Sequence, residues 1–189
     1  MTFPTRIFLD TTVVNFIIDY SEIIFDGVDF DENLSNRIID DLSAIMQIFQ
    51  YANRNAIEVV VSKTTFSEVR ATKDRAKRER LESYCTELSQ YFQYIVEDNF
   101  SPTPFELRYT EEYLNERGFS KLPDLNDRRL IVEALFYRCN IFCTRDWRTI
   151  LAKRKIIKNI IPLWILTPTE WYESYHGKIP KDYQSSQNH

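Results

Sequence analysis

The chain alternates short, continuously apolar runs with longer stretches in which apolar residues recur at helical spacing. The apolar runs are rich in β-branched and aromatic residues, which is typical of strands buried on both faces. They predict five strands, at residues 6–9, 57–62, 94–97, 140–144 and 162–168. The spacing between them predicts helices over residues 12–19, 35–53, 63–72, 73–92, 105–118, 127–138, 147–153 and 169–175.

The longest predicted helix, over residues 35–53, carries its apolar residues three and four positions apart, as Ile38, Leu42 and Phe49 illustrate. Such a stripe faces a protein core. The segment before this helix, residues 21–34, is acidic and has no sustained periodicity, so we expect a loop or insertion there.

Alternation of buried strands with helices implies an α/β fold, a three-layer α/β/α sandwich with a central parallel sheet of about five strands. The chain of 189 residues shows no internal repeat, and its length suits a single domain. We expect that domain to span residues 1–176, followed by a flexible tail at residues 177–189.

Composition and charge narrow the range of functions. The chain is 43% hydrophobic, as globular proteins are, and its three glycines disfavour a glycine-rich phosphate loop. Its net charge of −4 argues against broad, non-specific adhesion to nucleic acid. Its 24 lysines and arginines nevertheless allow a local basic face.

The cysteines and the apolar runs indicate where in the cell the protein is expected. The three cysteines lack the spacing of a disulfide framework, and Cys139 and Cys143 are expected to be buried thiols rather than zinc ligands. No apolar run approaches the length of a membrane helix, and the first residues do not resemble a secretory signal. We therefore expect a soluble cytoplasmic protein without a membrane partner.

Four carboxylates follow strand ends or begin helices: Asp10, Glu68, Asp127 and Asp146. In a parallel sheet these positions share the edge where ligands bind. Carboxylates brought together repel one another unless a cation is present, and oxygen ligands favour a hard divalent ion, Mg²⁺ or Mn²⁺. Such sites support metal-assisted phosphoryl transfer.

Alternative roles remain open for three of these positions. Asp10 and Asp146 each precede a predicted helix, so either carboxylate could be only a helix cap. Near the start of the helix at 127–138, Asp124 or Asn126 could cap the helix while Asp127 faces the site, or the roles could be reversed.

The segments RIFLDTTVV, SKTTFSEV, NDRRLIVEAL, FCTRDW and WILTPTEW together resemble the successive motifs of PIN domains, the family that includes VapC-type toxins. The resemblance runs from about residue 6 to about residue 173. It implies an Mg²⁺- or Mn²⁺-dependent ribonuclease whose catalytic metal ligands are Asp10, Glu68, Asp127 and Asp146. Thr144 matches a position that often orients such a site, whereas Thr12 stands where many relatives carry Asn or Ser.

The resemblance also implies partners: an RNA substrate, an antitoxin protein if the chain is a toxin, and a second copy in a homodimer. The helix at 35–53 and the aromatic C-terminal segment offer apolar surface for a dimer. The basic residues near the acids could hold phosphates or form surface salt bridges. They are Lys63, Arg128, Arg129, Arg145 and Arg148.

Two other functions compete with that of a ribonuclease. Haloacid-dehalogenase-like phosphatases also begin with an apolar strand that ends in an aspartate, but Thr12 replaces the second acid they need. A non-catalytic PIN-like module that binds RNA or protein is the other rival. Four retained acids argue against it, because a scaffold has no reason to gather mutually repelling carboxylates.

Overall fold

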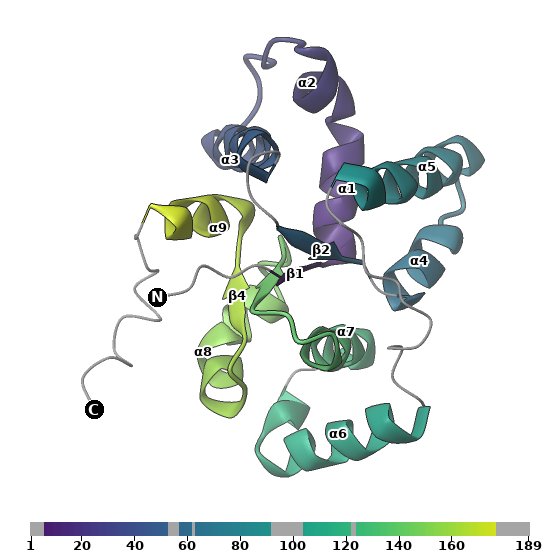
Figure 1. The fold of residues 1–189 in the computed structure, drawn as a ribbon, viewed down its shortest axis with the longest axis vertical. Helices are drawn as coiled ribbons and strands as arrows, with labels where there is room; N and C mark the ends of the chain where they lie inside the picture. The colour runs from purple at the N-terminus through teal and green to yellow at the C-terminus, as the bar shows by residue number, and fades with distance from the viewer. Residues whose placement is uncertain (1–5, 53–56, 62, 92–103, 122–123, 177–189) are drawn as a thin grey trace.

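The computed structural model of the chain describes residues 6–52, 57–61, 63–91, 104–121 and 124–176. Within the helices, some side chains fall outside this description, including those of Lys63 and Glu68. Helices and strands alternate along the chain, as the sequence predicts, and Figure 1 shows the strands at the centre with helices on both sides.

The described sheet has four parallel strands in the order β2-β1-β3-β4. Ile7 of β1 pairs with Val59 of β2 on one side and with Ile141 of β3 on the other. The strand expected at residues 94–97 lies outside the described residues. The strands are β1 (Arg6–Leu9), β2 (Glu58–Val60), β3 (Ile141–Cys143) and β4 (Trp164–Leu166).

The helices follow the predicted order. They are α1 (Thr11–Asp19), α2 (Ser21–Asp26), α3 (Asn36–Ala52), α4 (Lys63–Arg70), α5 (Arg75–Tyr91), α6 (Pro104–Glu116), α7 (Leu125–Phe136), α8 (Ile150–Ile160) and α9 (Pro168–Tyr175), with a 3₁₀ turn, η2 (Phe119–Lys121), before α7.

Two predicted elements differ from the structure. The expected loop over residues 21–34 was wrong at its start, where α2 forms because Ile23 and Ile24 pack against the core. This helix ends at Gly27, whose φ of 70° lies in the left-handed region that glycine adopts readily. The helix expected at 147–153 begins later and runs further, as α8.

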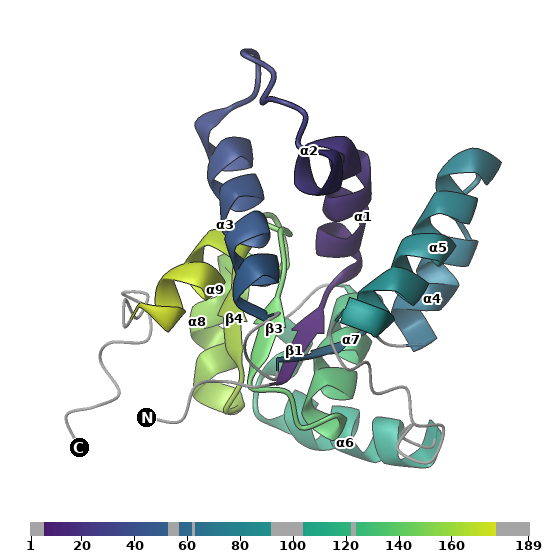
Figure 2. The same cartoon turned by 45° about the horizontal axis from the view of Figure 1, so that its top comes forward.

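Each strand buries both of its faces, as the continuous apolar runs predict. In β1, Ile7 and Leu9 belong to a core formed with α1, α3 and α9, whereas Phe8 belongs to a second core formed with α7 and α8. Successive side chains of a strand point to opposite faces of the sheet, so neighbouring residues of β1 belong to different cores. Figures 1 and 2 show α1, α3 and α9 on one side of the sheet and α6, α7 and α8 on the other. The three-layer α/β/α arrangement is thus compatible with the described part of the chain.

The surfaces proposed for a dimer are used at least partly within the chain. Helices α3 and α9 pack against each other, and Trp171 of α9 is buried in the same core as Leu42 of α3. The indole Nε1 of Trp171 donates a hydrogen bond to the Tyr175 hydroxyl at 2.9 Å. Dimerisation through these helices therefore stays a prediction.

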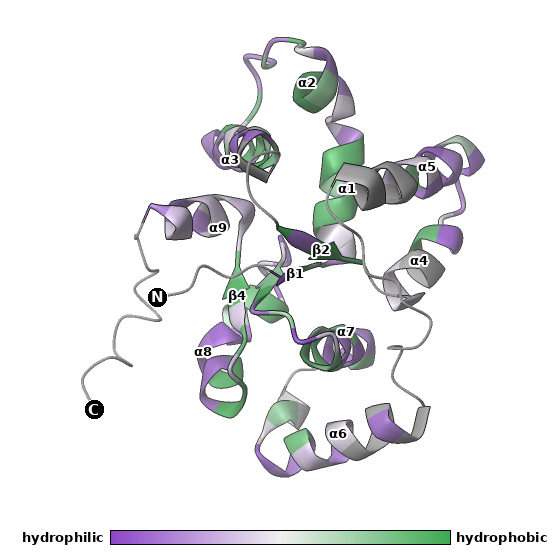
Figure 3. Ribbon diagram, in the orientation of Figure 1, coloured by the Kyte–Doolittle hydropathy of each residue, from purple (hydrophilic) through white to green (hydrophobic). Residues whose placement is uncertain are grey.

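The distribution of hydrophobic residues follows the layers. Figure 3 colours α1 mainly as hydrophobic and the coloured part of α5 mainly as hydrophilic, in keeping with their different burial. None of the helices in the described ranges is both long and apolar enough to cross a membrane. Cys139 and Cys143 are buried free thiols, and burial raises the pKa of both above the ordinary value.

Candidate functional site

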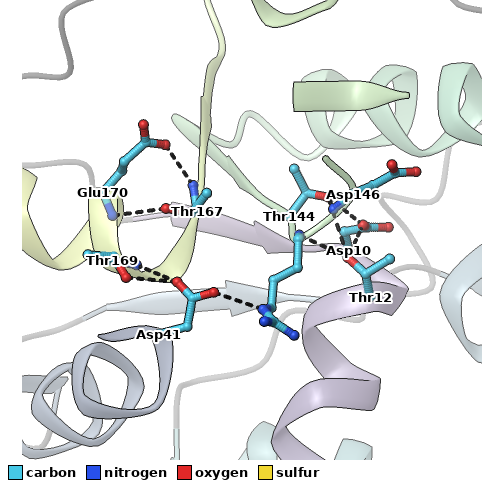
Figure 4. A network of polar contacts seen from close by, with 9 residues as sticks. Asp10, Thr12, Asp41, Thr144, Asp146, Thr167, Thr169 and Glu170 are labelled. Carbon is cyan, nitrogen blue, oxygen red and sulfur yellow. Dashed lines mark hydrogen bonds and ion pairs between the residues drawn. The ribbon is translucent and has the colours of Figure 1, made fainter. Parts of the chain in front are cut away.

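Asp10 lies where β1 ends and α1 begins, and its carboxylate contacts both the first turn of α1 and the residue that follows β3. It occupies the N-cap position of α1 but makes no side-chain cap hydrogen bond. Its Oδ2 accepts hydrogen bonds from the hydroxyls of Thr12 at 2.5 Å and Thr144 at 2.6 Å (Figure 4). Only 3% of Asp10 is exposed, so these two threonines provide the polar contacts that a buried carboxylate needs.

The same two hydroxyls hold the loop that follows β3. The Thr144 hydroxyl accepts a hydrogen bond from the Asp146 amide at 3.0 Å, and the Thr12 hydroxyl accepts one from the Arg145 amide at 3.0 Å. The Asp10 amide in turn donates to the Cys143 carbonyl at 3.0 Å. The carboxyl ends of β1 and β3 are thereby joined by both backbone and side-chain hydrogen bonds.

Asp146 is not the N-cap of α8, which is Thr149, but its carboxylate holds the turn that precedes that helix. Its Oδ1 accepts hydrogen bonds from the amides of Arg148 at 2.9 Å and Thr149 at 2.8 Å. The Thr149 hydroxyl donates to its Oδ2. These contacts stabilise the turn that leads into α8, while the carboxylate stays on the same edge as Asp10.

The structure assigns different roles to Asp124 and Asp127. Asp124 is the N-cap of α7, and its side chain accepts a hydrogen bond from the Asn126 amide at 2.7 Å. Asp127 lies in the first turn of α7, and its Oδ2 is buried without a hydrogen-bond partner among the described residues. Of the two alternatives, Asp124 is the cap.

Asp127 is the acid whose charge is most affected by its surroundings. Burial, with smaller contributions from the carboxylates of Asp124, Asp146 and Asp10, raises its pKa to about 6 against the opposing effect of the Thr149 hydroxyl. Asp10 and Asp146 follow the adjacent strands β1 and β3, and both are hydrogen-bonded to the Thr144 hydroxyl at one edge of the sheet. Asp127 lies in the first turn of α7, and the charges of these two acids act on it.

Glu68, the fourth acid, lies on α4, which follows β2, and its side chain is outside the described part of the structure. The helix itself is fixed against α7, because the Thr64 hydroxyl donates a hydrogen bond to Glu133 Oε1. Glu68 comes one helical turn after Thr64. Among the described residues, no group of three or more histidine, cysteine, aspartate or glutamate side chains is arranged to hold a metal ion.

The predicted phosphate-binding residues fall into different surroundings. Arg145 is held by Asp41 of α3, with its Nε 2.9 Å from Oδ2, and its guanidinium lies 3.5 Å from the centre of the Phe16 ring. The Arg128 guanidinium contacts Asn115 Oδ1 at 3.4 Å. Arg129 and Arg148 are exposed, and the side chain of Lys63 lies outside the described residues.

Sequence reasoning missed two buried carboxylates near this edge. Asp41 is 1% exposed and accepts hydrogen bonds from the hydroxyl and amide of Thr169 as well as from Arg145. Glu133 is 6% exposed on α7. The signal was present for Asp41, because it falls three residues after Ile38 and four before Ile45, inside the apolar stripe of α3.

The carboxyl ends of β1 and β3 thus carry Asp10 and Asp146, and the first turn of α7 carries Asp127, whose pKa is raised to about 6. Carboxylate oxygen atoms are the ligands that hard divalent cations prefer. A scan against protein-family models, a search of curated proteins and a search of solved structures each found no match to this chain.

Proposed function

We propose that this chain is a PIN-like, metal-dependent endoribonuclease that hydrolyses RNA phosphodiester bonds. The observation that supports the proposal best is the meeting of Asp10, Asp127 and Asp146 at the carboxyl edge of a parallel sheet, with the pKa of Asp127 raised to about 6. Residues with perturbed pKa values concentrate at functional sites. The order of the sequence motifs supplies the ribonuclease assignment.

The acids at this edge fit a divalent ion by their chemistry. They offer only oxygen atoms, and the buried Oδ2 of Asp127, which has no hydrogen-bond partner in the described part of the chain, is the kind of atom that a cation would satisfy. Asp10, Glu68, Asp127 and Asp146 would hold one or two Mg²⁺ or Mn²⁺ ions. When bound, such an ion activates water and stabilises the charge on the leaving oxygen.

The residues of the chain orient this site and set its protonation. Thr12 and Thr144 fix the Asp10 carboxylate, and Thr144 also fixes the Asp146 amide. Asp127 holds a proton on its carboxylate below about pH 6, and it must lose that proton to accept a cation. We therefore expect activity to fall as the pH decreases through this value.

The substrate and the partners are proposed from the resemblance and from the surface near the acids. Arg129 and Arg148 are exposed and could contact phosphates of the RNA, whereas Arg145 is engaged with Asp41. Products with 5′-phosphate and 3′-hydroxyl ends are expected. A role as the toxin of a toxin–antitoxin pair, with a protein antitoxin, is part of the same proposal.

The test is cleavage of single-stranded RNA with and without Mn²⁺. Asp10→Asn should abolish metal-dependent cleavage, because it removes a charge from the proposed ligand set. Thr144→Val should lower the rate roughly 10- to 100-fold, the range known for residues that orient metal ligands. Asp124→Asn is the matched control: asparagine also caps helices well, so cleavage should persist.

Cleavage that is indifferent to Mn²⁺ and to Asp10→Asn would contradict the proposal. The non-catalytic alternative is favoured by the turn after β3. There both oxygens of Asp146 already accept hydrogen bonds from neighbouring residues, which gives this carboxylate a structural role. A chain that binds RNA or a protein without cleaving RNA would favour that alternative.

A further inference from the structure

Trp147 is exposed beside the acidic edge. It is 44% exposed, and the guanidinium of Arg37, at the start of α3, lies 4.3 Å from the centre of its ring. Arg37 is itself exposed. The two side chains therefore form a cation–π pair at the surface, built from segments that lie 110 residues apart in the sequence.

The backbone beneath Trp147 is held in place. Its amide donates a hydrogen bond to the Arg145 carbonyl at 3.0 Å, and Asp146, directly before it, accepts hydrogen bonds from the amides of Arg148 and Thr149, directly after it. Trp147 follows directly after Asp146, so it is adjacent in the sequence to an acid of the proposed site.

We propose that Trp147 and Arg37 form a stacking subsite for an unpaired nucleobase of single-stranded RNA. An indole face binds any base by stacking, and a neighbouring arginine adds both cation–π attraction and a contact for phosphate. This inference takes its substrate class, RNA, from the proposed function. It adds the place at which the protein binds the RNA strand.

The chemistry around the indole favours RNA over a protein partner. Its neighbours are charged: Arg37 lies over the ring, and Asp146 and Arg148 flank it in the sequence. Tryptophan and arginine are also enriched at protein–protein interfaces, whereas aspartate is depleted there. An aromatic platform beside arginine is typical of single-strand nucleic-acid binding, and the adjacent Asp146 belongs to the proposed site of RNA cleavage.

The test measures binding apart from cleavage. A short, fluorescently labelled single-stranded RNA is titrated with the wild-type chain in EDTA, and binding is followed by anisotropy. Trp147→Ala should weaken binding roughly 5- to 100-fold, as expected for the loss of one stacked base. Trp147→Phe should keep most of the affinity, and Arg37→Ala should lose part of it.

The chain offers a matched control. Tyr113 of α6 is 46% exposed and carries the Arg117 guanidinium 4.4 Å from its ring centre, on a helix that contributes none of the four acids. Tyr113→Ala should leave RNA binding unchanged. Double-stranded RNA of the same sequence should be insensitive to Trp147→Ala, because its bases are already stacked.

The outcomes separate this inference from the proposed function. If RNA binds but Trp147→Ala leaves its affinity unchanged, the stacking subsite is wrong while the nuclease proposal stands. If binding depends on Trp147 but no metal-dependent cleavage occurs, the subsite stands and the nuclease proposal fails. If no RNA binds, or if both RNA forms are weakened equally, the subsite is wrong.

Discussion

At the scale of single residues, Asp127 is a carboxylate whose surroundings disfavour its charge. Its Oδ2 is buried, and three other carboxylates contribute to raising its pKa to about 6, from an ordinary value of 3.8. A residue that opposes stability in this way is expected where a ligand compensates for the cost.

Replacing Asp127 by asparagine should therefore stabilise the ion-free protein at pH 7.5. Because the folded pKa lies above the unfolded one, the folded state binds the extra proton between about pH 4 and 6. The free energy of unfolding accordingly falls as the pH rises through that window. Asp127→Asn has no carboxylate to ionise, so its free energy of unfolding does not fall in this window. The variant should be more stable than the wild type at pH 7.5 by roughly 1 kcal/mol, after allowance for solvent screening.

Urea denaturation at pH 4 and pH 7.5 measures this effect, and the gain should vanish at the lower pH. Asp124→Asn serves as a control, since it removes one of the weaker contributions to the Asp127 pKa and should give a smaller gain. Mn²⁺ should raise the melting temperature of the wild type but not of Asp127→Asn. A variant less stable than the wild type at pH 7.5 would contradict this account of the site.

At the scale of elements, one ion pair connects the loop after β3 to two helices. Asp41 of α3 accepts from Arg145 and from Thr169 of α9, and Figure 4 shows Asp41 and Thr169 in contact. Asp41 is 1% exposed, so its charge depends on these partners. The packing of α3 against α9 and the position of the loop are thereby coupled.

Removing Asp41 should be far more damaging than removing an exposed carboxylate. Asp41→Ala leaves the Arg145 side chain, which is 19% exposed, without its counter-ion and should cost roughly 3–5 kcal/mol of unfolding free energy. Asp19 pairs with Lys77 at 2.7 Å, but these side chains are 47% and 33% exposed, so Asp19→Ala should cost less than about 1 kcal/mol. Equal losses in urea denaturation would count against the coupling.

At the scale of the whole molecule, the local patterns of the sequence predict the layers and the edge, but not the long-range polar contacts. The apolar run around Phe8 predicts a strand buried on both faces, and Asp10 is predicted at its end because the run stops there. The pairing of Arg145 with Asp41 joins residues 104 positions apart, so no local pattern reports it. The sequence pattern does not predict helix α2, because the acidic residues after Phe25 obscure the short run of apolar residues that forms its buried side.

Topology explains why the candidate site lies between β1 and β3. The chain leaves β1 to form β2 on one side and later adds β3 on the other. The chain therefore continues from the adjacent strands β1 and β3 into helices on opposite faces of the sheet, α1 and α8, which is where ligands bind in open α/β sheets. Asp10 and Asp146 follow these two strands directly or after a short loop.

The threonine hydroxyls at this edge have a consequence for deuterium uptake. Arg145 and Asp146 lie outside any helix or strand, yet their amides donate to Thr12 and Thr144. Both should exchange slowly for loop amides. Thr144→Val should speed exchange at Asp146 more than at Arg145, and Thr12→Val should do the reverse. The kinetics of local opening here would then be set by two side-chain oxygens, one for each amide.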